Sequence, residues 1–231
     1  MGRGWAVAGV VVVMVAACSE TPRQPPIVMP SGPPPSAETT PSAAPGAAQS
    51  ASPSASPAGG PARYTFPVGG NPVSYQRTHS GYPATDIFAG CGSPVRAVTD
   101  GVVLEVSRVD RFDPANPDNA LKGGLFVSIK GDDGVRYYGA HLVEVAAGID
   151  KGARVRNGQA IGSVGHTGNA SNICHLHFGI SPPCAGERDW WIRRGVVWPW
   201  SYLDAWKGKV DKSPAPEVTK WHQELGCPSE P

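Results

Sequence analysis

Two histidines stand two residues apart in the segment 174–180, which reads CHLHFGI. The segment is rich in strand-forming residues and is followed by Pro182-Pro183, so we predict a β-strand. Because alternate side chains of a strand face the same side of a sheet, His175 and His177 should point together. Two such imidazoles can bind a metal, or one can bind it while the other transfers protons. The alternative is a polar strand face that carries two histidines by chance.

Other side chains suited to metal binding or proton transfer lie far from this pair in the sequence. His79 and Asp86 precede the first predicted core strand, and His141 follows a later one. One histidine, one aspartate and a distant histidine form a ligand set that suits zinc, with a fourth position left for water as in catalytic sites. The plainer alternatives are a turn aspartate for Asp86 and a core histidine for His141. His166 and His222 have no motif partner, and we expect them to be ordinary surface residues.

The elements that must position these groups are mostly short strands rich in β-branched or aromatic residues, separated by Gly and Asp turns. We expect one short helix over 201–207, with Ser201 as its N-cap. The predicted fold class is therefore all-β, an antiparallel β-sheet core with a small C-terminal appendage. The predicted strands are 95–98, 102–106, 125–129, 135–138 and the two halves of 154–164 around Asn157-Gly158.

The first 62 residues have the composition of a targeting segment followed by a tether. Arg3 precedes the uncharged apolar run 5–17, which is too short to span a bilayer comfortably and fits a signal peptide. The letters VAAC that end at Cys18 resemble a lipobox, which predicts cleavage and acylation at Cys18; a signal peptide with a chance cysteine is the alternative. Residues 19–62 are dominated by Pro, Ser, Ala and Gly and should form a disordered tether.

Four parts follow from this organisation. They are a lipoprotein signal peptide at 1–17, the lipidated cysteine and tether at 18–62, the β core at 63–185 and a Trp-rich C-terminal appendage at 186–231. The tryptophans of the last part can stack on sugar rings as a glycan-binding wall, or they can form an apolar lid that packs on the core. Arg193 and Arg194 could meet substrate carboxylates, or could simply be exposed.

The balance of charge argues against nucleic acid as a partner. The chain has 20 Lys and Arg against 19 Asp and Glu, so removal of Arg3 with the signal peptide leaves 19 of each. The sequence also has no basic run. We therefore expect no nucleic acid to bind.

Four cysteines remain after Cys18, an even number that predicts two disulfides in an oxidising compartment. Three pairings are possible. We favour Cys174–Cys184 with Cys91–Cys227, because the first bond could join the two ends of the strand that carries the histidines. A zinc–thiolate site is the alternative, but no CxxC spacing supports it.

Four motifs in order give the chain a more specific likeness: the His79…Asp86 pair, Tyr138-x-x-His141-Leu, the turn Gly165-x-Thr-Gly-Asn, and His-Leu-His-Phe at 175–178. In combination, over about residues 64–181, they resemble the LytM/lysostaphin-like zinc metallopeptidases. The resemblance implies a β-sheet core, one Zn²⁺ per chain, and hydrolysis of peptide bonds in peptidoglycan. By position, His79, Asp86 and His177 match the zinc ligands, and His141 and His175 match the two catalytic histidines that do not bind the metal.

One spacing departs from the family pattern. The commoner motif has three residues between the first histidine and the aspartate, but six separate His79 from Asp86. The insertion Gly81-Tyr82-Pro83 would have to form a loop so that both side chains reach one metal ion. We also expect Tyr82 or Tyr75 to donate a hydrogen bond to the oxyanion of the reaction.

We therefore predict a zinc endopeptidase that hydrolyses cross-links or stem peptides of peptidoglycan, exported and lipid-anchored to the cell membrane, facing the cell wall. The alternative is a catalytically silent relative that binds peptidoglycan or activates another hydrolase. A small-molecule-binding lipoprotein would explain neither the paired histidines nor the glycine-rich turn. Degenerate relatives lose ligands, whereas this chain keeps all five candidate residues. We expect a monomer; a regulatory protein is a further candidate partner beside peptidoglycan and the membrane.

Overall fold

The computed structural model describes residues 63–70, 72–184 and 189–230. The predicted signal peptide, Cys18 and the tether lie outside the described residues. Within the described ranges, no helix combines the length and the apolar character needed to cross a membrane.

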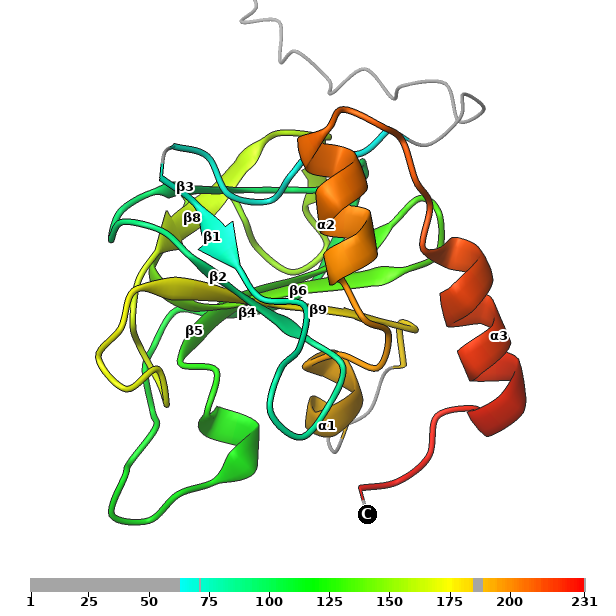
Figure 1. Ribbon diagram of the computed structural model, residues 1–231. Helices are drawn as coiled ribbons and strands as arrows, with labels where there is room; N and C mark the ends of the chain where they lie inside the picture. The colour runs from blue at the N-terminus through cyan, green and yellow to red at the C-terminus, as the bar shows by residue number, and fades with distance from the viewer. Residues whose placement is uncertain (1–62, 71, 185–188, 231) are drawn as a thin grey trace, which may run out of the picture. The chain divides into compact units, whose positions relative to one another are not determined.

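An antiparallel β-sheet dominates the described part of the chain (Figure 1). Every strand pairing in it is antiparallel, which confirms the predicted fold class. Along the main path, the neighbouring strands are β1 (Ser74–Tyr75), β2 (Thr85–Phe88), β9 (His175–Ser181), β6 (Arg136–Val145), β5 (Leu125–Gly131), β4 (Gly101–Ser107) and β7 (Arg154–Val155). Off this path, β3 (Pro94–Arg96) pairs with β8 (Ala160–Val164), which also pairs with β6.

The predicted strands correspond to β3 to β9, but β6 continues to Val145, so His141 lies within this strand and not after it as predicted. Sequence reasoning missed β1 and β2. The four residues of β2 stand just after a run of turn-forming residues, which leaves little periodic signal. In β2, Thr85 and Ile87 are buried while Asp86 is only half-buried. This alternation turns Asp86 to the face opposite the core.

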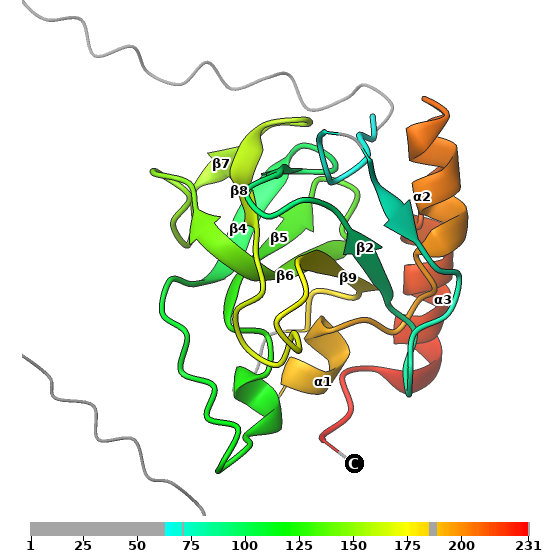
Figure 2. The ribbon, with the colours of Figure 1, turned by 60° about the vertical axis from the view of Figure 1, so that its left-hand side comes forward.

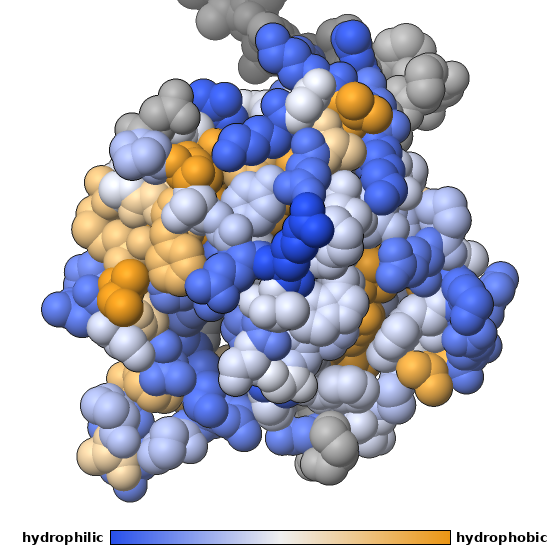
Figure 3. All heavy atoms as spheres, in the orientation of Figure 1, coloured by the Kyte–Doolittle hydropathy of each residue, from blue (hydrophilic) through white to orange (hydrophobic). Residues whose placement is uncertain are grey.

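The apolar side chains and the two histidines of β9 lie on opposite faces of the sheet, as the alternation along a strand predicts. Leu176, Phe178 and Ile180 belong to the hydrophobic core. His175 and His177 alternate with them and therefore lie on the other face of the sheet. In the view of Figure 3 the surface is mostly hydrophilic, with a local apolar area on its left-hand side.

Helices follow the sheet in the C-terminal part: α1 (Trp190–Arg193), α2 (Trp200–Lys207) and α3 (Ala215–Leu225). Figure 2 shows α2 and α3 on the same side of the sheet. The predicted helix over 201–207 begins one residue earlier, and Pro199 rather than Ser201 is its N-cap, so that detail was wrong. The helix α3 was not predicted, although Pro216 near its start and Gly226 after its end, with φ of 67°, are ordinary boundary signals.

Trp206 of α2 is part of the core rather than of an exposed aromatic wall. Its ring stacks on Tyr64 with 5.3 Å between centroids and meets Tyr137 and Phe178 edge-on at 6.2 Å. Its Nε1 donates a hydrogen bond to the Lys212 carbonyl at 2.9 Å. This tryptophan therefore attaches the C-terminal segment to the sheet.

The chain forms two disulfides, but the predicted pairing was wrong. The bonds are Cys91–Cys174 and Cys184–Cys227, with Cα–Cα distances of 5.3 and 5.7 Å. Nine residues separate Cys174 from Cys184, and the seven that form the extended strand β9 alone span about 23 Å, far beyond the reach of one disulfide. Instead, the β2–β9 pairing brings Cys91 to the start of β9.

Candidate metal and catalytic site

Asp86 of β2 and His177 of β9 are direct cross-strand partners, so their side chains share a face. Asp86 Oδ1 lies 3.0 Å from His177 Nδ1, and Asp86 Oδ2 lies 3.7 Å from His79 Nε2. One ligand atom from each of the three residues lies within 4.8 Å of the others. Ligand atoms around a tetrahedral zinc ion are about 3.4 Å apart, since each is about 2.1 Å from the metal. The three predicted ligands are therefore close enough together to hold such an ion.

The insertion between His79 and Asp86 forms the loop that the spacing required. Gly81, with φ of 90°, provides a backbone conformation that other residues rarely adopt. The loop brings the Tyr82 ring against His79, with 4.4 Å between centroids, and Arg194 stacks its guanidinium 3.9 Å from the same tyrosine ring. The longer spacing thus leaves His79 beside Asp86.

Both ring nitrogens of His177 have defined neighbours. Nε2 is 3.0 Å from the backbone carbonyl of Arg194, which can only accept, so Nε2 carries a proton. Nδ1 faces the Asp86 carboxylate, which is also an acceptor. With its proton on Nε2, a neutral His177 ring has a lone pair on Nδ1. This lone pair and the Asp86 carboxylate, 3.0 Å apart, are both acceptors, so they need a cation or a further proton between them. A histidine that donates one N–H to a carbonyl and turns its other nitrogen toward a carboxylate has the surroundings of a metal ligand.

His141 reaches the same face through a β-bulge. In the β5–β6 ladder Phe126 pairs with Ala140 and Leu125 with Leu142, so His141 is the extra residue between them. Its φ of 64° is left-handed, and its N–H bonds to the Gly123 carbonyl at 2.9 Å. Ala140 faces the site beside His177, so regular alternation would turn the next side chain away. The bulge instead brings the His141 ring to 4.8 Å from that of His175.

The glycine-rich turn at 165–169 holds His141 in this orientation. The Thr167 carbonyl accepts a hydrogen bond from His141 Nδ1 at 2.8 Å. The Thr167 hydroxyl donates to the Leu142 carbonyl and accepts from the Leu125 N–H, which fixes the turn to both strands beside the bulge. At Gly168, with φ of 67°, a Cβ atom would lie 2.2 Å from the Lys122 carbonyl oxygen, so only glycine fits.

The two histidines that are not in the ligand set present the same nitrogen to the site. His175 Nδ1 donates to the Ile173 carbonyl at 2.8 Å, as His141 Nδ1 does to Thr167. Each Nε2 is then free to accept a proton. Burial, with the nearby charges of His177 and His175, lowers the pKa of His141 to about 3, so this ring is neutral near pH 7.

The pKa shifts of two proposed ligands, His79 and Asp86, favour the protonation states that bind a cation. Burial is the main cause of a lowered pKa at His79, which favours the neutral ring that binds metals. At Asp86, burial alone would raise the pKa, but the hydrogen bond and charge of His177, with His175 and His79, lower it overall. The carboxylate of Asp86 is therefore ionised at neutral pH.

The two tyrosines proposed as oxyanion donors lie in different places. The Tyr75 hydroxyl donates to Asp204 of α2 at 2.7 Å, so its proposed role was wrong. Tyr82 lies at the site, 5.8 Å from His177 between ring centroids, and burial raises its pKa to about 12. Tyr138 of β6 was part of the Tyr-x-x-His motif but was assigned no role, and its buried ring is 6.1 Å from that of His177. Its spacing from His141 in that motif was the signal that could have indicated a place at the site.

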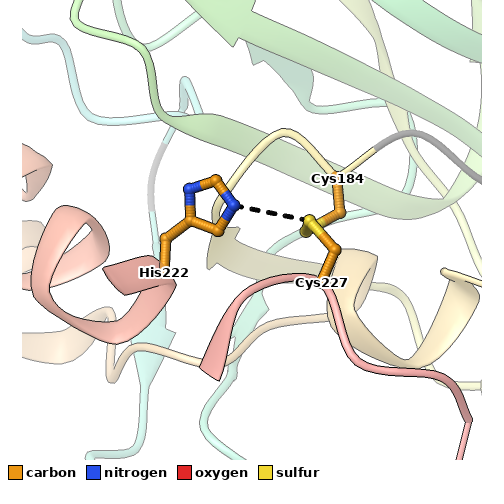
Figure 4. Close-up of side chains that lie close together, drawn as sticks. All are labelled: Cys184, His222 and Cys227. Atoms are coloured by element: carbon orange, nitrogen blue, oxygen red, sulfur yellow. Dashed lines mark hydrogen bonds between the residues drawn. A yellow bond between two sulfur atoms is a disulfide. The ribbon is translucent and has the colours of Figure 1, made fainter. Parts of the chain in front are cut away.

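The remaining histidines do not contribute to this cluster. His166 is exposed, although it lies in the glycine-rich turn. His222 approaches Cys184 and Cys227, and its Nε2 lies 3.5 Å from Cys227 Sγ (Figure 4). Both sulfurs are bonded to each other, so they cannot act as thiolate ligands.

Residues 78–187 match the sequence model of Peptidase family M23. This region, just under half of the chain, is similar to a peptidase M23 domain, and we refer to it as the M23 domain. The L-Ala–D-Glu endopeptidase of Bacillus subtilis is 35% identical over 57% of this chain, and the glycyl-glycine endopeptidase ALE-1 of Staphylococcus capitis is 35% identical over 40%. The aligned part spans only 36% and 22% of those two relatives. A LytM crystal structure from Ruminococcus gnavus is 25% identical with a TM-score of 0.49, covering 66% of this chain and 63% of that one.

The M23 domain contains all five residues that the motifs singled out. They come from the loop before β2, from β2 itself, from the bulge in β6 and from β9. The structure brings their side chains together on one face of the sheet.

Proposed function

We propose that the M23 domain is a zinc-dependent endopeptidase that hydrolyses peptide bonds in peptidoglycan. The observation that carries the proposal is the convergence of His79, Asp86 and His177, in which a backbone carbonyl fixes the tautomer of His177. Peptide bonds as the substrate are supported by the M23 match and by two relatives named for an L-Ala–D-Glu bond and a glycyl-glycine bond. The motifs shared with LytM/lysostaphin-like enzymes support peptidoglycan.

In this proposal the ion would be held by Asp86, by His79 through Nε2 and by His177 through Nδ1. A bound Zn²⁺ lowers the pKa of water and polarises a carbonyl group. The backbone carbonyl of Arg194 accepts a hydrogen bond from His177 Nε2 and so keeps the proton there. His177 Nδ1 is then available to bind the metal. The carboxylate of Asp86 offsets positive charge at the site.

The other two histidines move and hold protons. In their neutral forms His141 and His175 each present Nε2 as an acceptor, because their Nδ1–H groups are bound to carbonyls. One of these nitrogens takes the proton of the attacking water as general base, and the proton then passes to the nitrogen of the leaving amine as the peptide bond breaks. Tyr82 keeps its phenolic proton at neutral pH and donates it in a hydrogen bond to the oxyanion of the substrate.

The deciding experiment joins a metal measurement to a product measurement on the purified protein. We expect one zinc per chain and release of peptides from purified peptidoglycan that a chelator stops, with product masses that identify the bond. His177→Ala should lose both zinc and release, whereas the matched surface change His166→Ala should keep both. Full zinc content in His177→Ala would contradict the ligand assignment. Zinc without any release would favour the catalytically silent alternative.

We further propose that acylation of Cys18 anchors the protein to the membrane on the cell-wall side, a proposal that rests on the sequence pattern alone. Two or more acyl chains bury enough methylene groups for stable anchoring. Growth with labelled palmitate should label the protein that begins at Cys18, and this protein should be found in the membrane fraction. Cys18→Ala should remove the label; a Cys18→Ala protein that is still labelled would refute the anchor.

A further inference from the structure

A cavity of about 580 Å³ lies beside the sheet, between β4, the loop 108–124 and α1. The loop carries the short helix η1 (Asn119–Leu121), which lies next to α1 in both views (Figures 1 and 2). Its lining combines apolar side chains such as Phe126 and Trp190 with the charged groups of Glu105, Arg111, Lys151 and Arg193. None of these residues belongs to the ligand set or to the histidine pair.

Strand register connects this cavity to the candidate metal site. Asp86, His177, Ala140, Phe126 and Ser107 are successive partners across β2, β9, β6, β5 and β4. Partners in such a row face the same side of the sheet. Since neighbouring strands are about 4.8 Å apart, the cavity wall at Phe126 is about 10 Å from His177 and at Ser107 about 14 Å. An extended peptide covers that distance with three or four residues.

Arg193 lies between the cavity and the candidate metal site. Its guanidinium lies 4.4 Å from the Phe126 ring and 5.4 Å from the Tyr138 ring, and Tyr138 in turn neighbours His177. It also forms an ion pair with Glu105. These contacts form a continuous row of side chains from the metal site to the cavity.

The charges of the cavity favour an anionic occupant. Both acidic groups of its lining are already paired, Glu105 with Arg193 and Asp189 with a buried arginine of β6. Arg111 and Lys151 at the rim are exposed, and within the described residues their side chains form no ion pair. The charges of the lining that have no partner in the described part of the chain are therefore positive. The apolar side chains of the lining can pack against the aliphatic carbons of an occupant.

We propose that this cavity binds a carboxylate-bearing residue of the peptide substrate, three or four residues from the bond that is cut. The inference rests on the proposed function, because it assigns a second contact to the same substrate. The carboxylate meets Arg111 and Lys151, and the aliphatic part of the residue lies against Phe126 and Trp190.

The test compares equilibrium binding of two probes to the full chain. They are labelled stem-peptide fragments prepared from purified peptidoglycan and the same fragments with their carboxylates converted to amides. We expect the free carboxylates to bind at least fivefold more tightly than the amides, with a difference that shrinks in high salt because rim charges are screened. Arg111→Glu with Lys151→Glu should abolish the preference and leave the zinc content unchanged.

Control variants and kinetics separate this proposal from the proposed function. Arg156→Glu with Lys209→Glu makes the same change in charge at exposed positions outside the cavity lining and should keep the preference. If the enzyme hydrolyses the fragments, the cavity variant should raise KM at least fivefold for the free carboxylates and leave kcat unchanged. Equal binding of acid and amide by the unmodified protein would overturn the cavity assignment even if hydrolysis is normal. A preference for the acid in a protein that does not hydrolyse would support the cavity while the proposed function fails.

Discussion

The Cys91–Cys174 disulfide cross-links the two strands that carry two of the proposed ligands. Cys91 stands three residues after β2, and Cys174 directly precedes β9. Asp86 and His177 are partners in the ladder between these strands. Replacing both cysteines with alanine removes the bond without leaving a free thiol, and it loosens the end of the ladder next to the site.

The size of the effect follows from the loop that the bond closes. A sequence separation of 83 residues corresponds to about 4.6 kcal/mol of unfolding free energy at 25 °C from chain entropy. For a domain of about 170 residues this lowers Tm by about 9–18 °C. The Cys184–Cys227 bond, with a separation of 43, should contribute about 4.0 kcal/mol. The two bonds therefore differ little in stability, and a difference in zinc binding reports on their position.

We expect the Cys91→Ala/Cys174→Ala variant to bind zinc about tenfold more weakly, in the range found when groups that orient metal ligands are removed. The Cys184→Ala/Cys227→Ala variant should bind zinc as the unmodified protein does. Unfolding is measured with a chelator present, since bound zinc would add stability of its own. Zinc affinity is measured by competition with a chromogenic chelator at a temperature where circular dichroism shows both variants folded. An equal loss of zinc affinity in both, or a stability loss under about 1 kcal/mol in the first, would refute the reasoning.

Three further predictions concern the groups around the site. Arg136→Met should cost about 3–5 kcal/mol of unfolding free energy in urea, because it leaves the buried Asp189 carboxylate without its partner at 2.6 Å; a loss below about 1 kcal/mol would contradict this. Gly168→Ala should disturb the turn that orients His141, so peptide release should fall at least tenfold while zinc content is kept; unchanged release would show that the turn is not needed. Burial raises the pKa of Tyr64 to about 12, above its unfolded value near 10, so its contribution to stability is complete below pH 10 and is lost as pH rises toward 12. Tyr64→Phe should therefore lose less stability between pH 9 and 11.5 than the unmodified protein, and an equal loss would refute this cause.

The sequence predicted much of the fold because the deciding signals are local. Short runs of β-branched residues between glycine turns correspond to β3 to β9. The period of two in β9 correctly separated the core side chains of Leu176 and Phe178 from the two histidines. The helix α3 was missed for a different reason: it contains few apolar residues, and Val218 is its buried residue, so it does not resemble a helix that packs on a core.

The geometry of the site depends on pairings between distant segments, which local patterns do not contain. A regular β6 would turn His141 away from His175, and only the extra residue opposite β5 reverses this. That bulge is stabilised from outside the strand, by the Gly123 carbonyl and by the turn at Thr167. The same holds for the disulfides, since the partner of Cys174 is fixed by the β2–β9 register rather than by closeness in the chain. Residue types thus identified what chemistry is available, whereas the sheet register determines which groups act together.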